Sequence, residues 1–318
     1  MRLNSKWTTL AVLAALIALT PIFFPSSFYY RVGSLVFVNG LAVTGLVILI
    51  GWAGQISLGH AGFAGIGAYA VALAPVHWGL HPALALVLGA VLSAALAWLI
   101  GRPILRLQGY YLGVATLGFG ILVAMVLSNE SWLTGGPDGM AVEDLGLRGW
   151  LGDLGIDIKN SEFWYWFTGV ILLVGAWLAL NLYDSPTGRA LRALHGSGVA
   201  ARTVGIDVAA AKLNAFVISA VYASVAGSLL ALMNKFITPD VAGFMHSIEM
   251  VTMAVLGGAA SVPGAILGAG ILTLLPQVLT VFAEYEQLML GATMMIVMIF
   301  LPQGVVPAIL RLIGGRGK

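Results

Sequence analysis

No charged residue interrupts the stretch Ala83-Leu-Ala-Leu-Val-Leu-Gly-Ala-Val-Leu-Ser-Ala-Ala-Leu-Ala-Trp-Leu-Ile-Gly101. An α-helix needs about 20 predominantly apolar residues to cross the hydrocarbon core of a bilayer, and this stretch nearly supplies them. Of the 318 residues, 60% are hydrophobic and 9% are charged, whereas soluble domains carry about 25% charged residues. A soluble fold with so few charges could not cover its surface, so the sequence predicts a membrane protein.

Composition also excludes several classes of function. The net charge of +2 is small and its carriers are scattered, so no nucleic-acid partner is expected. The chain has no cysteine, and therefore no disulfide and no thiolate metal site.

Hydropathy predicts an all-α, polytopic fold with about ten transmembrane helices, within a range of about eight to ten. The expected spans are 7–25, 33–51, 62–76, 83–101, 110–128, 163–182, 213–233, 247–257, 264–282 and 287–305. The two short spans, 62–76 and 247–257, both adjoin glycine clusters. Nothing resembles a soluble second domain, so residues 1–318 are expected to form a single transmembrane domain.

The distribution of Lys and Arg among short loops predicts the orientation. Segment 183–212 carries Arg189, Arg192, Arg202 and Lys212 against two acids, whereas segment 129–162 carries seven acids and two basic residues. Placing the basic segment inside puts 129–162 outside and both the N and C termini in the cytoplasm. The N-terminal apolar stretch has prolines where a signal-peptide cleavage site would lie, so it is expected to be an uncleaved span.

Two glycine-rich breaks fall at predicted membrane depth. The first contains Gly51, Gly54, Gly59 and Gly62 with the polar residues Gln55, Ser57 and His60; the second contains Gly257, Gly258, Gly264, Gly268 and Gly270. Unwound backbone is tolerated in a membrane only where it is buried in protein or lines a wet cavity, and breaks in both halves of a chain point to a translocation path. Two interpretations stay open: close helix packing, for which Gly264 and Gly268 fit G-x-x-x-G, or packing combined with lining of the path.

Glu249 is the clearest acid within a predicted span. An ionised carboxylate there costs about 2.5–3.5 kcal/mol on insertion scales, which makes it a functional candidate by default. The alternative places Glu249 half-solvated at the outer interface beside His246. An intramembrane hydrolase is disfavoured, because Ser57 and His60 are too close in sequence for a catalytic triad, and no catalytic or metal-binding residue is predicted.

The segment Gly51–Tyr69 resembles the signature G-x-x-G-x-x-S-L-G-x-A-x-F-x-G-I-G-A-Y of the membrane subunits of branched-chain amino acid ABC importers. Further blocks of that family follow in the same order: Gly109–Gly120, Leu133–Gly139, Gly188–Ala193, Ala200–Ile206, Lys212–Phe216 and Val255–Gly258. The resemblance covers about residues 35–310, and it is to the LivM-type permease rather than to its LivH-type partner.

The resemblance implies a permease subunit in a bacterial inner membrane. It would pair with a second, LivH-type permease, be driven by two cytoplasmic ATPase subunits and receive substrate from a periplasmic binding protein. The chain lacks G-x-x-x-x-G-K-[ST], so ATP would be used by the partner subunits and no cofactor is expected on this chain. The expected substrate is a branched-chain or similar amino acid; urea, amides, aromatic acids, or an ion-coupled transporter using Glu249, are the alternatives.

The resemblance also implies that segment 183–212 is the element that docks the ATPase. Pro186 predicts the start of one short helix, Gly196-Ser-Gly198 a break, and 199–204 a second short helix that ends at Gly205. The residues expected to couple to the ATPase are Arg189, Arg192, Ala200, Ala201, Arg202, Gly205 and Lys212. The stretch Leu194–Val199 lacks the acids usual in the family, which argues against docking through acidic side chains there.

Overall fold

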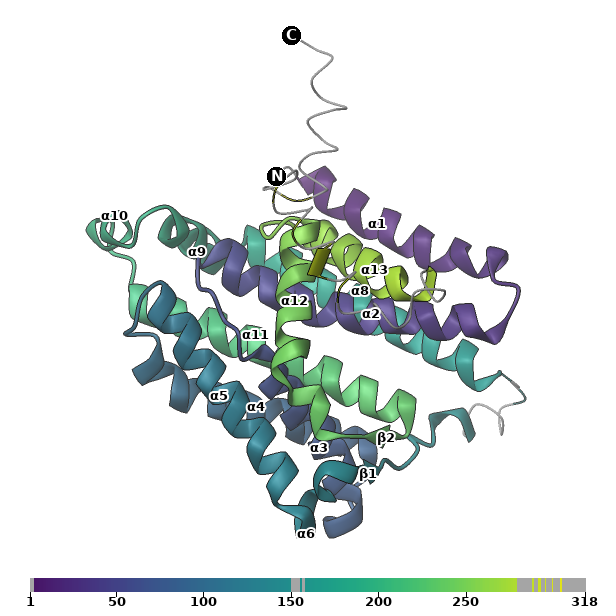
Figure 1. The fold of residues 1–318 in the computed structure, drawn as a ribbon. Helices are drawn as coiled ribbons and strands as arrows, with labels where there is room; N and C mark the ends of the chain where they lie inside the picture. The colour runs from purple at the N-terminus through teal and green to yellow at the C-terminus, as the bar shows by residue number, and fades with distance from the viewer. Residues whose placement is uncertain are drawn as a thin grey trace.

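The computed structural model describes residues 3–149, 155 and 158–278, and the single residues 288, 291, 292, 295, 299 and 304. Helices make up nearly all of these residues, which confirms the all-α prediction (Figure 1). The expected span 287–305, the end of 264–282 and the C terminus lie outside the continuous described stretches.

Seven helical segments are long and apolar enough to cross a membrane, which supports a multi-pass membrane protein. They are α1 (Leu3–Leu19) with η1 (Thr20–Phe23), α2 (Ser27–Leu46) with the π-helical turn η2 (Val47–Trp52), α3 (His60–Trp78), α4 (Pro82–Ile104), α5 (Tyr110–Asn129), α8 (Asn160–Asp184) and α11 (Val208–Asn234). The shorter apolar helices α12 (Phe244–Gly257) and α13 (Val262–Val278) follow. Each of the first nine expected spans thus coincides with a helix, but α12 is only 14 residues long, too short to cross a bilayer alone.

The remaining elements lie at the two ends of α11. The short helices α9 (Pro186–Gly196) and α10 (Gly198–Thr203) lie within segment 183–212 and precede α11. At the opposite end, β1 (Met140–Ala141) pairs antiparallel with β2 (Phe236–Ile237), with Met140 opposite Ile237. Three single turns, α6 (Ser131–Thr134), η3 (Gly136–Asp138) and η4 (Pro239–Ala242), complete this end.

Local sequence signals explain where the helices start and stop. Helix α3 ends at Gly79, whose φ of 60° is the left-handed conformation that glycine adopts without strain. Helix α4 then begins with Pro82, which needs no hydrogen bond at the first helical position, and His81 Nδ1 accepts the N–H of Ala83. A short turn therefore reverses the chain between two spans.

Helix α11 is central to the bundle, because it packs against α2, α3 and α4 (Figure 1). Small residues permit its close approach to α3: a Cβ on Gly67 would overlap the backbone of Ser224, and a Cβ on Gly227 would overlap that of Ala64. Such small-residue contacts are typical of helices that associate in membranes, where van der Waals packing replaces the hydrophobic effect.

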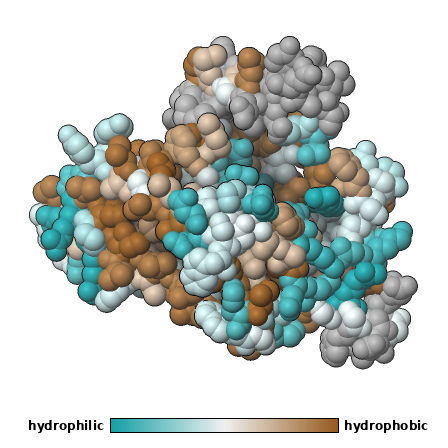
Figure 2. All heavy atoms as spheres, turned by 60° about the horizontal axis from the view of Figure 1, so that its bottom comes forward, coloured by the Kyte–Doolittle hydropathy of each residue, from teal (hydrophilic) through white to brown (hydrophobic). Residues whose placement is uncertain are grey.

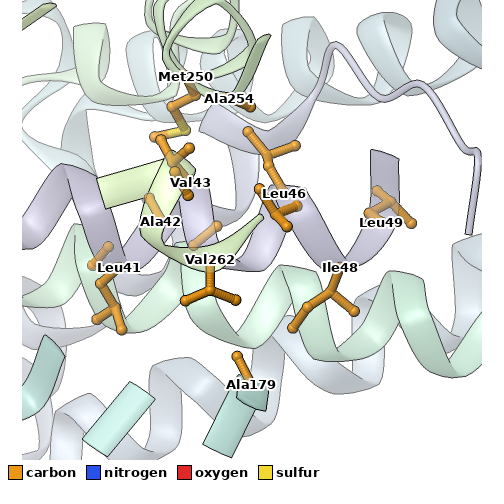
Figure 3. Close-up of a cluster of buried hydrophobic side chains, with 14 of the residues drawn as sticks. Leu41, Ala42, Val43, Leu46, Ile48, Leu49, Ala179, Met250, Ala254 and Val262 are labelled. Atoms are coloured by element: carbon orange, nitrogen blue, oxygen red, sulfur yellow. The ribbon is translucent and has the colours of Figure 1, made fainter. Parts of the chain in front are cut away.

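The core continues where α12 and α13 meet α2. Figure 3 shows Val43 and Leu46 of α2 beside Met250 and Ala254 of α12, with Val262 of α13 close by. Helix α12 runs crosswise to α2 and α11 rather than along them (Figure 1).

The outer surface of α4 and α5 is apolar. Figure 2 shows a broad apolar area with hydrophilic side chains on both sides of it. The exposed large side chains of these two helices include Leu84, Val87, Val91, Leu99, Leu122 and Met125. A surface of this kind fits the interior of a bilayer or a second membrane subunit, and not water.

Candidate translocation site and coupling helices

The first glycine-rich stretch is unwound between η2 and α3. One end of this stretch lies at α9, because a Cβ on Gly54 would be 3.2 Å from His195 Nδ1. Its other end, His60, lies 2.5 Å from Ser219 Oγ, near the middle of α11. Residues 53–59 therefore run from the end of the bundle into its interior, where α3 begins beside the middle of α11. The predicted break is confirmed, and 51–67 is not one continuous span.

A buried polar cluster lies where α3 begins. His60 is fully buried; its Nδ1 is 2.9 Å from Ser57 Oγ and its Nε2 contacts Ser219. Burying such groups is costly unless they are hydrogen-bonded, so these contacts hold the unwound segment against α11. Gln55 is also buried, and neither atom of its amide has a partner among the described residues. The sequence singled out Gln55, Ser57 and His60, but it missed Ser219, which is one of three serines in the apolar helix α11.

Two of the predicted path glycines pack against α5. A Cβ on Gly59 would overlap Thr116 O, and a Cβ on Gly62 would lie 3.2 Å from Gly120 Cα. Thr116 Oγ1 in turn accepts the N–H of Leu58 at 3.1 Å. Close packing therefore accounts for both glycines, and their lining of a path stays a prediction.

The second glycine cluster closes the α12–α13 hairpin. A Cβ on Gly257 would overlap Gly264 O, and one on Gly268 would overlap Met253 O, so the G-x-x-x-G packing face is confirmed. Gly258 has a φ of 108°, which a residue with a side chain rarely adopts.

The two glycine clusters, some two hundred residues apart in sequence, meet in space. A Cβ on Gly51 would overlap Ala259 O, and Trp52 Nε1 donates to Ala260 O at 3.1 Å. The sequence predicts that both clusters lie at membrane depth. It does not predict that they touch, because the two clusters do not align as an internal repeat that would relate their positions.

Helices α3 and α12 also meet at their N-terminal ends. Ser247, in the first turn of α12, accepts the N–H of Ala61 in the first turn of α3 at 3.1 Å. Before α12, η4 reaches α3 from the opposite end of the bundle, and Ala242 Cβ would lie 2.6 Å from a Cβ on Gly65. The first turns of α3 and α12 therefore meet, each with its partial positive charge, although Phe244 and Met245 at the very start of α12 are exposed.

Glu249 is half-exposed rather than buried. Its Oε2 lies 3.3 Å from His246 Nδ1, and the side chains of Glu249 and His246 are 43% and 20% exposed. The contact with His246 is thus present, and the choice between an intramembrane acid and a half-solvated acid at the outer interface stays a prediction. The pair lies near the N-terminal end of α12.

The two short helices of segment 183–212 form where the sequence predicts them. Ser185 caps α9 by accepting the N–H of Gly188 at 3.1 Å, and Ser197 caps α10 by accepting that of Ala200 at 3.2 Å. Gly205, with a φ of 81°, ends the second helix in the left-handed conformation, as expected.

The side chains of this segment divide into inward and outward groups. Contrary to the expectation that both alanines face a partner, Ala201 is only 2% exposed and packs on the chain's own core, whereas Ala200 is exposed. Arg189 and Arg192 donate to the last carbonyl groups of α8, those of Asp184 and Tyr183, at 2.9 and 2.7 Å. These two arginines therefore fix α9 to α8.

The outward group around α10 includes two large apolar side chains and one basic residue, together with the polar Ser197 and Thr203. Val199 and Val204 are 76% and 73% exposed, and the exposed Arg202 lies between them in sequence. Lys212 lies half-buried in the first turns of α11. Val204 is an apolar contact that the sequence predicts for the second short helix. Val199 was not singled out as a contact, because isolated valines are ordinary in so apolar a chain.

Comparison with known proteins identifies the family. The sequence profile described as "Branched-chain amino acid transport system / permease component" matches residues 29–298. The LivM permease protein of Salmonella typhimurium is 35% identical over 86% of this chain and 69% of its own length, and that of Escherichia coli K12 is 35% identical over 83% and 66%. The LivH permease protein of Salmonella typhimurium is 30% identical over 83% of this chain and 90% of its own length.

This chain spans about two thirds of the length of the two LivM relatives. No solved structure matches it significantly. The profile covers most of the sequence, and the signature stretch 51–69 lies inside it at the break between η2 and α3. The chain therefore belongs to the family of permease components of branched-chain amino acid transport systems.

Proposed function

We propose that the chain is one of two permease subunits of an ATP-driven importer in a bacterial inner membrane. It translocates branched-chain or similar amino acids, which a periplasmic protein delivers, and two cytoplasmic ATPase subunits supply the energy. Family membership supports the transport of amino acids. The relatives with the LivM and LivH names support a pair of unlike permeases.

The outward face of α10 is the observation that carries the proposal. Val199 and Val204 are largely exposed on a short helix at the end of the bundle, with Arg202 beside them. Exposed apolar side chains rimmed by a charge fit a protein partner. We assign this face to the ATPase, which explains why a six-residue helix is kept in place by a serine cap and a glycine stop.

The junction of α3 and α12 is our candidate for the substrate path. The positive N-terminal ends of α3 and α12 suit the carboxylate of a zwitterion. Backbone carbonyl groups of the adjoining unwound segments suit its ammonium group. The buried, unpartnered amide of Gln55 lies in one of those segments.

The decisive experiment is uptake of labelled leucine by proteoliposomes that hold the two permeases and the ATPase subunits, with binding protein and leucine on one side and ATP on the other. We expect uptake that requires ATP and disappears when the P-loop lysine of the ATPase is replaced. Unlabelled isoleucine and valine should compete with leucine, and urea, simple amides and phenylalanine should not.

Two other results would replace the proposal. Strong competition by urea, an amide or phenylalanine would assign the alternative substrate to the same machinery. Uptake by this chain alone, driven by an ion gradient, would make it a secondary transporter.

The docking face is tested by charge introduction. Val199→Asp and Arg202→Glu should each lower co-purification of the ATPase by about tenfold, the size of one good interface contact. The control is Lys159→Glu, an exposed residue at the opposite end of the bundle, which should have no effect. Co-purification at the wild-type yield from both α10 variants would assign docking to another surface.

A further inference from the structure

Trp52 joins three segments at the end of η2. Its side chain is buried, with 1% of the residue exposed. The indole N–H donates to Ala260 O, in the turn between α12 and α13, at 3.1 Å. The indole ring also packs edge-on against the ring of Tyr183, with the centroids 5.2 Å apart.

Tyr183 is also held by a residue of α9. The guanidinium of Arg192 lies 3.7 Å from the centre of the Tyr183 ring and also donates to Tyr183 O at 2.7 Å. Stacking over an aromatic face and a charge-assisted hydrogen bond act together here, so Arg192 and Tyr183 are expected to move as a unit. The side chains of Arg192, Tyr183 and Trp52 thus form a continuous series from α9 to the α12–α13 turn.

The series continues through close backbone contacts at two glycines. The backbone at Gly51 lies so close to Ala259 that a Cβ there would overlap it, and Gly257 lies equally close to Gly264. At its far end, α12 holds the start of α3 through Ser247 and Ala61. Packed atoms thus connect α9 to the junction where the first turns of α3 and α12 meet.

We infer that Trp52 is a positioning residue for coupling: it transmits the movement of α9 to the α12–α13 turn. This inference rests on the proposed function, because it assumes that an ATPase moves α9. Its indole suits the role, because the ring is rigid and its single donor group has one direction, toward Ala260 O.

The inference predicts a loss of coupling rather than a loss of folding. Trp52→Phe keeps a ring against Tyr183 but removes the hydrogen bond to Ala260 O. In proteoliposomes with the full complex, we expect ATP hydrolysis stimulated by loaded binding protein to persist. The number of substrate molecules transported per ATP should fall about fivefold, as expected when one hydrogen bond is lost.

A second variant tests the other end of the series. Arg192→Lys keeps the positive charge but loses the flat guanidinium over Tyr183, and it should lower transport per ATP in the same direction. In the double variant, Trp52→Phe should add little further loss, because residues of one series are not independent. The matched control is Trp164→Phe, a buried tryptophan at the other end of α8, which should transport normally.

The outcomes separate cleanly. Normal transport per ATP in both Trp52→Phe and Arg192→Lys, or fully additive losses in the double variant, would overturn the inference. If Trp52→Phe prevents assembly of the complex, Arg192→Lys decides alone. If the wild-type complex shows no ATP-driven uptake at all, the proposed function fails. That result is distinct from a change in the number of substrate molecules transported per ATP.

Discussion

Individual glycines in this bundle differ in what a side chain would meet. A Cβ on Gly227 of α11 would overlap the backbone of Ala64, which cannot move without displacing α3. A Cβ on Gly118 of α5 would meet nothing within 4 Å. The sequence alone does not distinguish what surrounds these two residues, because both are glycines within an apolar helix.

Alanine should therefore have opposite effects at the two positions. Gly227→Ala should destabilise the protein by at least ~1–3 kcal/mol, the usual range for overpacking. Gly118→Ala should be neutral or stabilise by up to about 1 kcal/mol, because alanine favours a helix. The midpoint of thermal unfolding in detergent measures both. Equal midpoints for the two variants would contradict the packing between α3 and α11.

The buried histidine offers a second residue-scale prediction. His60→Ala removes the partner of both Ser57 and Ser219 and leaves a cavity beside Phe63 and Phe216. Unpaired buried groups cost about 1–3 kcal/mol each, so this variant should unfold at a clearly lower temperature than the protein itself. Ser219→Ala removes only one of the two contacts, so its unfolding temperature should lie between those of His60→Ala and the unsubstituted protein. A Ser219→Ala loss larger than that of His60→Ala would show that the histidine is not the centre of the cluster.

Among the elements, the short strands β1 and β2 hold segment 129–162 against the end of α11. Asp144 and Lys235 reinforce them with an ion pair, and the hydrogen bond from Lys235 holds the pKa of Asp144 below its ordinary value of 3.8. A carboxyl group with a lowered pKa adds stability above its ordinary pKa, and that stability is lost as the pH falls through the lowered value. Both side chains are 48% exposed, so solvent screens the pair and the contribution is small.

Oxidation of Met140, which lies on β1, reports on this tie. We expect slow conversion to the sulfoxide at neutral pH and faster conversion once the pH falls below 3.8. Lys235→Met should give the faster rate already at neutral pH. The exposed Met245 of α12 is the internal control, because its rate should not depend on the pair. A rate at Met140 that ignores both pH and Lys235→Met would exclude a role for the ion pair.

Elements with local signals were predictable, and elements set by distant contacts were not. The start of α9 and the stop of α10 follow from Pro186 and Gly205, whose effects are confined to one turn. The crosswise course of α12 depends on Gly264 and Gly268 of another helix. The inward turn of Ala201 depends on how α10 lies on the core, which a helix of six residues does not show through its own periodicity.

The molecule as a whole has a predicted orientation that can be tested directly, because the chain contains no cysteine. Ser197→Cys, at the exposed start of α10, should resist an impermeant thiol reagent in intact cells and react after permeabilisation. Asp144→Cys should react in intact cells. Reaction of Ser197→Cys from outside would invert the topology. The orientation can be predicted from the Lys and Arg bias because that bias depends only on which loops carry positive charge, and not on how the helices pack.

The contact between His60 and Ser219 has a consequence for biosynthesis. The two residues are 159 positions apart. At about 5–20 residues per second, the ribosome makes Ser219 roughly 8–32 s after His60. Throughout that interval, α3 has left the ribosome with a polar start and without the hydroxyl group that completes its hydrogen bonds. Lipid cannot supply a hydrogen-bond partner, so the insertion machinery must keep the nascent α3 beside water or protein until α11, the seventh span, is inserted.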